Sequence, residues 1–271
     1  MSTILVTTDF SALSENAAVY AAGLAREKDC RLVLLHSFIL PVSVTPSSIN
    51  VVSGNDLYTA AMESMDKLET KLQDTGFRGE IKKIVKEGVL LEQMTETIQA
   101  EEPFLIVMAT TGKGKFETLM IGSNTFSAIQ EMHVPVMVVP GNATYKPIKK
   151  LGVSCDFKQV KETVPNGLVK SFASFLGAEL HFVNVDHNNE QFTTNTPGEF
   201  RDIRSEFPNE AIHFIESKDI TEGIESFIND VQIDCLMMFP RKHGLLNQIF
   251  GESNTRKIAL HTHIPVLAIH K

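Results

Sequence analysis

Two short glycine-containing segments of this chain have the residue types that bind phosphate. The first is Ala109-Thr110-Thr111-Gly112-Lys113-Gly114-Lys115, and the second is Gly122-Ser123-Asn124-Thr125. Glycine lets backbone N–H groups approach phosphate oxygens, and a helix N-terminus offers unpaired donors and a partial positive charge. Lys113 and Lys115 add positive charge, and Ser123, expected as a helix N-cap, adds a hydroxyl donor. The structural alternative is that the glycines only make a turn and that Ser123 only caps a helix.

Several common catalytic and nucleotide-binding motifs are absent from the sequence. No G-x-x-x-x-G-K-[ST] occurs, and no G-x-G-x-x-G follows the first expected strand. The chain also lacks the G-x-S-x-G turn that exposes the serine of an α/β hydrolase. Walker ATPases, Rossmann dehydrogenases and serine hydrolases of that type are therefore poor fits.

The elements that must position the two segments alternate along the chain. In the first half, strands are expected at 4–9, 31–38, 80–86, 104–109 and 135–139, and helices at 13–28, 56–74, 90–101 and 122–132. In the second half, strands are expected at 149–155, 179–185, 210–215, 234–239 and 265–269, with a helix over 160–176. This alternation is typical of βαβ units, in which helices cover a parallel sheet. Both segments then lie at the carboxyl edge of the sheet, where such proteins bind ligands.

The two halves of the chain repeat one pattern. Ser123-Asn124-Thr125 recurs as Ser253-Asn254-Thr255, and His133-Val134-Pro135-Val136 recurs as His263-Ile264-Pro265-Val266. Both matches have the same offset of 130 residues. Because a shared offset over two separate matches is hard to obtain by chance, we predict two homologous domains.

These features resemble the universal stress protein family in its tandem, two-domain form. Nucleotide-binding members carry G-x2-G-x9-G-[ST]; Gly112, Gly122 and Ser123 match this motif, and Ala109 replaces its first glycine. The resemblance covers residues 1–144 and 145–271. It implies an α/β fold of two Rossmann-like or flavodoxin-like domains of the adenine nucleotide alpha hydrolase-like type. Each would hold a five-stranded, mainly parallel sheet flanked by helices.

The resemblance also implies a ligand for the first domain, namely ATP or AMP, with or without Mg²⁺. Asp9 would face the ribose, and the backbone of Ser37, which follows His36, would read adenine. The expected binding residues are Asp9, Ser37, Ala109, Gly112, Lys113, Gly122, Ser123 and Asn124. From its position alone, Asp9 has two other roles open to it, which are capping the helix that begins near Ser11 and, less favoured, acid catalysis.

The phosphate pattern is missing from the second domain. The offset of 130 places Lys242 at the position of Gly112, Glu252 at that of Gly122 and Phe239 at that of Ala109. A carboxylate would repel phosphate, and a phenylalanine would crowd the strand end. We expect this domain to serve structurally, in an intramolecular pseudo-dimer joined through the last strands, with a homodimer left open. That pairing would set Val136–Val139 against Val266–Ile269.

Composition excludes several classes of function. The net charge of -8 argues against nucleic acid as a partner. Apolar runs are too short to span a bilayer, and the N-terminus lacks a signal-peptide pattern, so we expect no membrane partner and a cytoplasmic location. Cys30, Cys155 and Cys235 are too scattered for a metal site, although His261 and His263 raise a weak zinc alternative. No metal is therefore expected, and the thiols are expected to be reduced and buried.

We accordingly expect a stress-response or signalling protein that binds an adenine nucleotide and has no catalytic residues of its own. The polar segment 41–55 is expected to be a loop that covers the bound ligand. Two alternatives are a slow ATPase or self-phosphorylating protein, which lacks an evident general base, and a nucleotide-free scaffold, which Ala109 favours.

Overall fold

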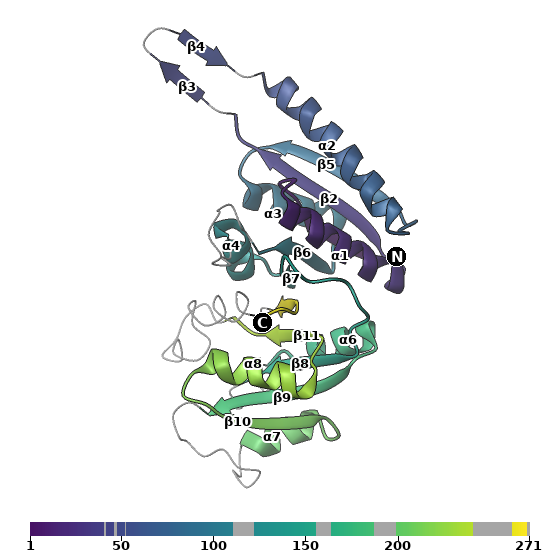
Figure 1. Cartoon of the computed structure of the whole chain (residues 1–271), viewed down its shortest axis with the longest axis vertical. Coiled ribbons are helices and arrows are strands. Elements are labelled where there is room, and N and C mark those ends of the chain that lie inside the picture. The colour runs from purple at the N-terminus through teal and green to yellow at the C-terminus, as the bar shows by residue number, and fades with distance from the viewer. Residues whose placement is uncertain are drawn as a thin grey trace.

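One ten-stranded sheet runs through the protein (Figure 1). The computed structural model describes residues 1–40, 42–45, 48–51, 53–110, 122–155, 164–186, 199–240 and 262–269. The first half contributes β1 (Thr3–Thr7), β2 (Arg31–Phe38), β5 (Ile81–Glu87), β6 (Leu105–Ala109) and β7 (Val136–Val139). The second half contributes β8 (Lys150–Ser154), β9 (Glu179–Asp186), β10 (Ala211–Glu216), β11 (Cys235–Met238) and β12 (Val266–Ala268). Their order across the sheet is β10-β9-β8-β11-β12-β7-β6-β1-β2-β5.

Helices cover both faces of this sheet. The helices are α1 (Ala12–Lys28), α2 (Gly54–Asp74), α3 (Leu90–Glu101), α4 (Ser123–Glu131), α6 (Asn166–Leu176), α7 (Glu199–Glu206) and α8 (Ile220–Val231). Buried side chains of α1, α2, α6 and α7 form one apolar core, and those of α3, α4 and α8 form another on the opposite face. None of the helices within the described ranges combines the length and apolar character needed to cross a membrane.

The ten strands expected from the sequence are all present, within two residues of the predicted positions. Neighbouring strands within each half run parallel, which confirms the α/β fold with a mainly parallel sheet. The two halves meet at β7 and β12, which pair antiparallel with Val138 opposite Val266 and Val136 opposite Ala268. The predicted contact between the last strands is thereby confirmed, and it covers two edges that would otherwise template aggregation.

The sequence predicted a loop over residues 41–55, but the structure differs. The segment contains an antiparallel hairpin of β3 (Val42–Thr45) and β4 (Ser48–Val51), which extends away from the main sheet beyond α2 (Figure 1). Its serine content suggested a loop, but the runs V-S-V-T and S-I-N-V are rich in β-branched residues, which favour strands. In the second half, α6 begins at Asn166, and the part of its predicted range before residue 164 lies outside the described residues.

Contacts between helical layers join the halves as well. Phe104, just before β6, packs against Phe172 and Phe175 of α6 at ring-centroid distances of 6.0 and 4.6 Å. The Lys28 ammonium at the end of α1 donates to the Leu176 carbonyl, 2.7 Å away, at the end of α6. A cation there satisfies an orphan carbonyl and complements the helix dipole. The two halves therefore share one continuous core.

Two histidines form a hydrogen-bonded pair on the outer strands of the second half. Nδ1 of His181 on β9 lies 3.2 Å from Nε2 of His213 on β10, and the rings are stacked. Burial lowers the pKa of His181, and the nearby Lys150 ammonium lowers it further. Burial likewise lowers the pKa of His213, with His181 and Lys150 adding to the effect. Both rings therefore resist protonation in the folded protein.

Acid should consequently weaken folding through this pair. Above about pH 6.5 both histidines are neutral in the folded and unfolded chain. Below it, the unfolded chain binds protons that the folded protein resists, so stability falls with pH, by at most about 1.4 kcal/mol per pH unit for each histidine, until its lowered pKa is reached. Urea unfolding between pH 8 and 5 measures this fall. In the double variant His181→Gln, His213→Gln, the free energy of unfolding should depend less on pH than in wild type. The control variant His133→Gln, at an exposed histidine, should keep the wild-type dependence. Equal pH dependence of the double variant and wild type would refute the assignment.

Candidate functional site

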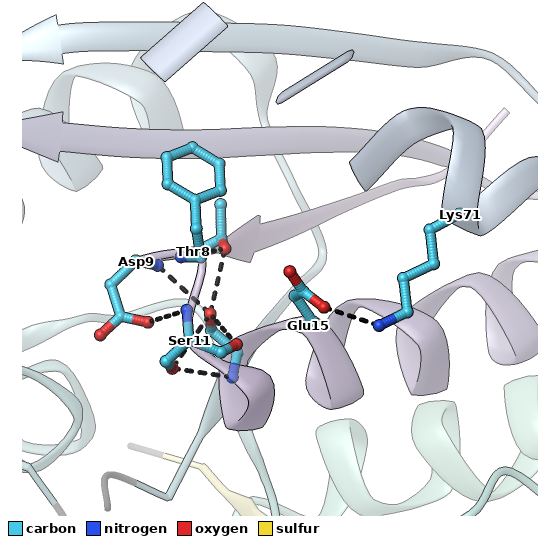
Figure 2. A network of polar contacts seen from close by, with 7 residues as sticks. Thr8, Asp9, Ser11, Glu15 and Lys71 are labelled. Carbon is cyan, nitrogen blue, oxygen red and sulfur yellow. Dashed lines mark hydrogen bonds and ion pairs between the residues drawn. The ribbon is translucent and has the colours of Figure 1, made fainter. Parts of the chain in front are cut away.

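The turn from β1 to α1 is built from short polar side chains (Figure 2). Ser11 is the N-cap of α1, and its hydroxyl accepts from the Ser14 N–H. One carboxylate oxygen of Asp9 accepts from the Ser11 N–H at 3.0 Å. The Ser14 hydroxyl lies 3.1 Å from that of Thr8 and accepts from the Asp9 N–H. These contacts hold Asp9 at the carboxyl end of β1, and capping by Ser11 leaves the carboxylate with a supporting role in the turn.

Phe10 gives this turn its shape. Its φ of 59° lies in the left-handed region that residues other than glycine seldom adopt. Its N–H donates to the Thr8 hydroxyl, and its ring packs on that of His36 with centroids 4.5 Å apart. His36 in turn donates through Nδ1 to the Thr8 carbonyl, 2.8 Å away. β2 therefore braces the turn next to Ser37.

The opposite wall is formed by β6 and α4. The sequence suggested Ser123 as the N-cap of this helix, but the N-cap is Gly122, and Ser123 is the first helical residue. The prediction was wrong by one residue because serine favours the N-cap strongly, whereas glycine is also accepted there. No side chain caps α4 within the described residues. Thr125 instead ties the helix to the strand, since its hydroxyl donates to the Ala109 carbonyl at 3.0 Å.

A cleft of about 570 Å³, including its open mouth, lies between these two walls. Its lining residues come from the ends of β1, β2 and β6 and from the first turns of α1, α3 and α4. They are Thr7, Thr8, Asp9, Ser11, Ser14, Ser37, Leu90, Met108, Ala109, Thr110, Asn124 and Thr125. Most carry hydroxyl, amide or carboxylate groups, so the cleft can hydrogen-bond a polar ligand along much of its surface.

Thr110 has an unsatisfied group in this cleft. The residue is 1% exposed, and its hydroxyl has no hydrogen-bond partner within the described part of the chain. A buried hydroxyl without a partner costs about 1–3 kcal/mol. Such groups are uncommon in folded proteins and often mark a place that a ligand or water completes.

Comparison with known proteins places the chain in a family. The model of the universal stress protein family matches residues 1–140. The chain belongs to this family. Universal stress protein MJ0577 of Methanocaldococcus jannaschii is 27% identical over 152 residues, which cover 50% of this chain and 93% of that protein.

Solved structures extend the likeness to the whole length. A universal stress protein from Archaeoglobus fulgidus covers 99% of this chain, and this chain covers 96% of it, with a TM-score of 0.67 and 18% identity. That match shows the tandem universal stress protein fold. Another member of the family has been solved in complex with cAMP; it matches 51% of this chain with a TM-score of 0.40 and 16% identity.

The structure brings together only part of the residue set inferred from the universal stress protein motif. Asp9, Ser37, Ala109 and Asn124 line the cleft. Gly122 and exposed Ser123 lie at the start of the adjacent helix α4, but neither of them lines the cleft. Gly112 and Lys113 lie outside the described residues. Sequence reasoning missed Thr7, Thr8, Ser14 and Thr110 as lining residues. For the three threonines the available signal was a small hydroxyl residue at or just after a strand end, whereas Ser14 lies in the first turn of α1.

The second universal stress protein domain keeps one side-chain-to-backbone hydrogen bond of the first, but a large side chain stands at the end of its central strand. The Asn184 amide on β9 donates to the Cys155 carbonyl at 3.2 Å, as His36 does to Thr8. Phe239, at the position equivalent to Ala109, is 7% exposed and belongs to the core. Lys242 and Glu252 lie outside the described residues.

The cysteines of this universal stress protein are structural. Cys30, Cys155 and Cys235 are buried, as predicted, and none of them forms a disulfide among the described residues. Burial raises the pKa of the Cys235 thiol to about 12. Its thiolate, the form that reacts and binds metal, is therefore suppressed. Within the described ranges, no three histidine, cysteine or acidic residues come together as metal ligands.

Proposed function

We propose that the first domain binds an adenine nucleotide, ATP or AMP, in the cleft between β1 and β6, and that the protein acts in stress response or signalling. The observation that carries the proposal is the pairing of two kinds of group across one cleft. Hydroxyls and the Asp9 carboxylate line one wall, and the first turn of α4, which no described side chain caps, adjoins the other. Ribose hydroxyls suit the first wall and phosphate suits the second.

The proposal gives each group one role. The Asp9 carboxylate accepts a hydrogen bond from a ribose hydroxyl while its hydrogen bond from the Ser11 N–H holds the turn. The Ser37 backbone contacts adenine. The N–H groups of the first turn of α4 bind phosphate, assisted by Asn124, Gly112 and Lys113. The proposal also includes the domain limits 1–144 and 145–271, a cytoplasmic location and a structural role for the second domain.

The decisive experiment identifies what the purified protein carries. Acid extraction followed by chromatography should release an adenine nucleotide, and calorimetry of the stripped protein with ATP, ADP and AMP should give saturable heat. Asp9→Ala should weaken this binding. If extraction releases nothing and none of the three nucleotides gives heat up to millimolar concentration, the nucleotide-free scaffold is the better account.

A change at Thr110 isolates one contact of the cleft. Thr110→Val removes the unpartnered hydroxyl and nearly preserves the side-chain shape, so the free protein should lose no stability. Nucleotide affinity should fall about fivefold if the ligand supplies the missing partner, since one hydrogen bond contributes about 1 kcal/mol. Calorimetry and urea unfolding measure the two effects.

Thr97→Val is the matched control. Thr97 is equally buried, but its hydroxyl donates to the Gln93 carbonyl at 2.7 Å on α3. This variant should lose stability and keep nucleotide affinity. The reverse pattern, with Thr110→Val destabilised and binding as wild type, would remove Thr110 from the site.

A further inference from the structure

A second cavity lies at the junction of the two halves, apart from the proposed nucleotide cleft. It encloses about 830 Å³ including its mouth. Its walls come from α1, the linker that follows β7, the end of α8 and the turn before β12. Polar groups on these walls belong to Tyr20, Asn142, Thr144, Lys146, Gln232, Asp234 and His263. Because four separate segments from both halves meet here, the cavity exists only in the assembled pair of domains.

The equivalent place on the other side of the domain junction holds an aromatic contact. The offset of 130 that relates the halves pairs Asp234 with Phe104, and each residue directly precedes a central strand. Phe104 packs on two phenylalanine rings of α6, whereas Asp234 lines a cavity beside Tyr20 of α1. The repeat therefore has an aromatic contact on one side and a polar cavity on the other.

Tyr20 supplies the main indication of a ligand. The residue is 2% exposed, yet it lines the cavity; none of the described residues gives its hydroxyl a hydrogen bond, and the oxygen is not fully shut off from solvent. Burial raises the pKa of Tyr20, and Cys235, Tyr145 and Asp234 raise it further, so the phenol keeps its proton. A phenol this buried is expected to have a partner. The cavity is where that partner can sit.

Charge in the cavity is balanced. The Asp234 carboxylate accepts from the Lys146 ammonium at 2.7 Å and from the backbone N–H groups of Lys149 and Lys150 at 2.9 and 3.0 Å. Its side chain is 12% exposed, and that of Lys146 is 64% exposed. A charged ligand would place a third charge without a counter-charge beside the Lys146–Asp234 ion pair, whereas an uncharged ligand would not.

Hydroxyl groups fit these surroundings best. A hydroxyl both donates and accepts, so one ligand can donate to Asp234 and accept from Lys146 or Tyr20. Ile228, Ile264 and Pro265 give the cavity an apolar side as well. A sugar or polyol presents both hydroxyl edges and C–H surfaces. We propose that the cavity bordered by Tyr20, Lys146 and Asp234 binds a small, uncharged, hydroxyl-rich molecule of sugar or polyol size.

The test uses the full chain and three probes, ribose, glucose and glycerol. Amide chemical shifts should saturate with at least one probe, and the shifts should concentrate at 142–146 and 263–265. Tyr20→Phe should weaken that binding about fivefold and leave the free energy of unfolding unchanged or higher, because it removes only the unpartnered hydroxyl. Tyr58→Phe, at an exposed tyrosine of α2, should change neither quantity.

Two results would overturn the proposal. One is that the cavity holds water only, in which case the amide chemical shifts change linearly with probe concentration and do not saturate for any of the three probes. The other is saturable binding that Tyr20→Phe leaves intact, which would place the ligand elsewhere. The titration is repeated with saturating ATP, which occupies the proposed nucleotide cleft. Probe binding in this cavity should be the same with and without ATP, so the two sites are tested separately.

Discussion

Gly122→Glu should weaken nucleotide binding by about a hundredfold. Gly122 is the N-cap of α4, so a side chain added here extends over the first-turn N–H groups that the proposal assigns to phosphate. A carboxylate at about 5 Å from a phosphate charge costs roughly 3 kcal/mol at an effective dielectric constant of 20. That energy corresponds to about two orders of magnitude in the dissociation constant.

The backbone tolerates this change, so the variant should remain folded. Gly122 has φ -66° and ψ 155°, which any residue adopts. The chain itself carries Glu252 at the equivalent position of the second domain. Calorimetry with ATP and AMP measures the loss, and thermal unfolding checks the fold.

Gly167→Glu is the matched control for charge at a helix N-terminus. Gly167 lies in the first turn of α6 in the second domain, and a Cβ added there meets no atom within 4 Å. This variant should bind nucleotide as wild type does. Equal affinity of Gly122→Glu and wild type would exclude the α4 N-terminus as the phosphate site. Phosphate release that persists in Gly122→Glu would belong to a contaminant rather than to a slow ATPase.

Much of the fold could be predicted because it follows from local patterns. The central strands are short apolar runs buried on both faces, such as Ile4–Val6 and Leu32–Leu35, and most strands of the main sheet alternate with helices along the chain. Since crossovers between parallel strands have one hand, few arrangements remain. The repeat at an offset of 130 then predicted the second half, and the resemblance implied the contact between the last strands; the antiparallel direction of that pairing comes from the structure.

The candidate site was less predictable because its geometry depends on contacts between distant segments. Asp9 and Ala109 could be found from strand ends alone. The unsatisfied Thr110 hydroxyl and the Thr125 bond to the Ala109 carbonyl could not, since they arise only when β6 and α4 are packed. The cavity beside Tyr20 is harder still, because its walls come from four segments far apart in sequence.

Gly23→Ala should destabilise the protein, against the usual effect of this change in a helix. Alanine in a helix interior is ordinarily about 1 kcal/mol more favourable than glycine. A Cβ at Gly23, however, would lie 2.4 Å from Cγ and 2.8 Å from Cβ of Tyr145. Those atoms adjoin the backbone, so the linker itself must move. Overpacking of this kind typically costs 1–3 kcal/mol, which outweighs the helix gain, and we expect a net loss of about 1 kcal/mol.

The loss would come from the contacts by which the linker holds the domains together. Tyr145 packs edge-on against Tyr20 and donates its hydroxyl hydrogen bond to Glu27, both on α1. Moving the ring disturbs both contacts. Urea unfolding of the full chain measures the change, and a single transition would show that the shared core unfolds as one unit.

Gly167→Ala provides the opposite sign in the same protein. It also lies in a helix, but its added Cβ has open space, so it should stabilise the fold by up to about 1 kcal/mol. Adding Tyr145→Ala to Gly23→Ala should then recover the favourable sign, because the clashing ring is gone; the comparison is with Tyr145→Ala alone. If Gly23→Ala stabilises the chain as Gly167→Ala does, Tyr145 does not pack on α1, and the domains are joined by β7 and β12 without the linker.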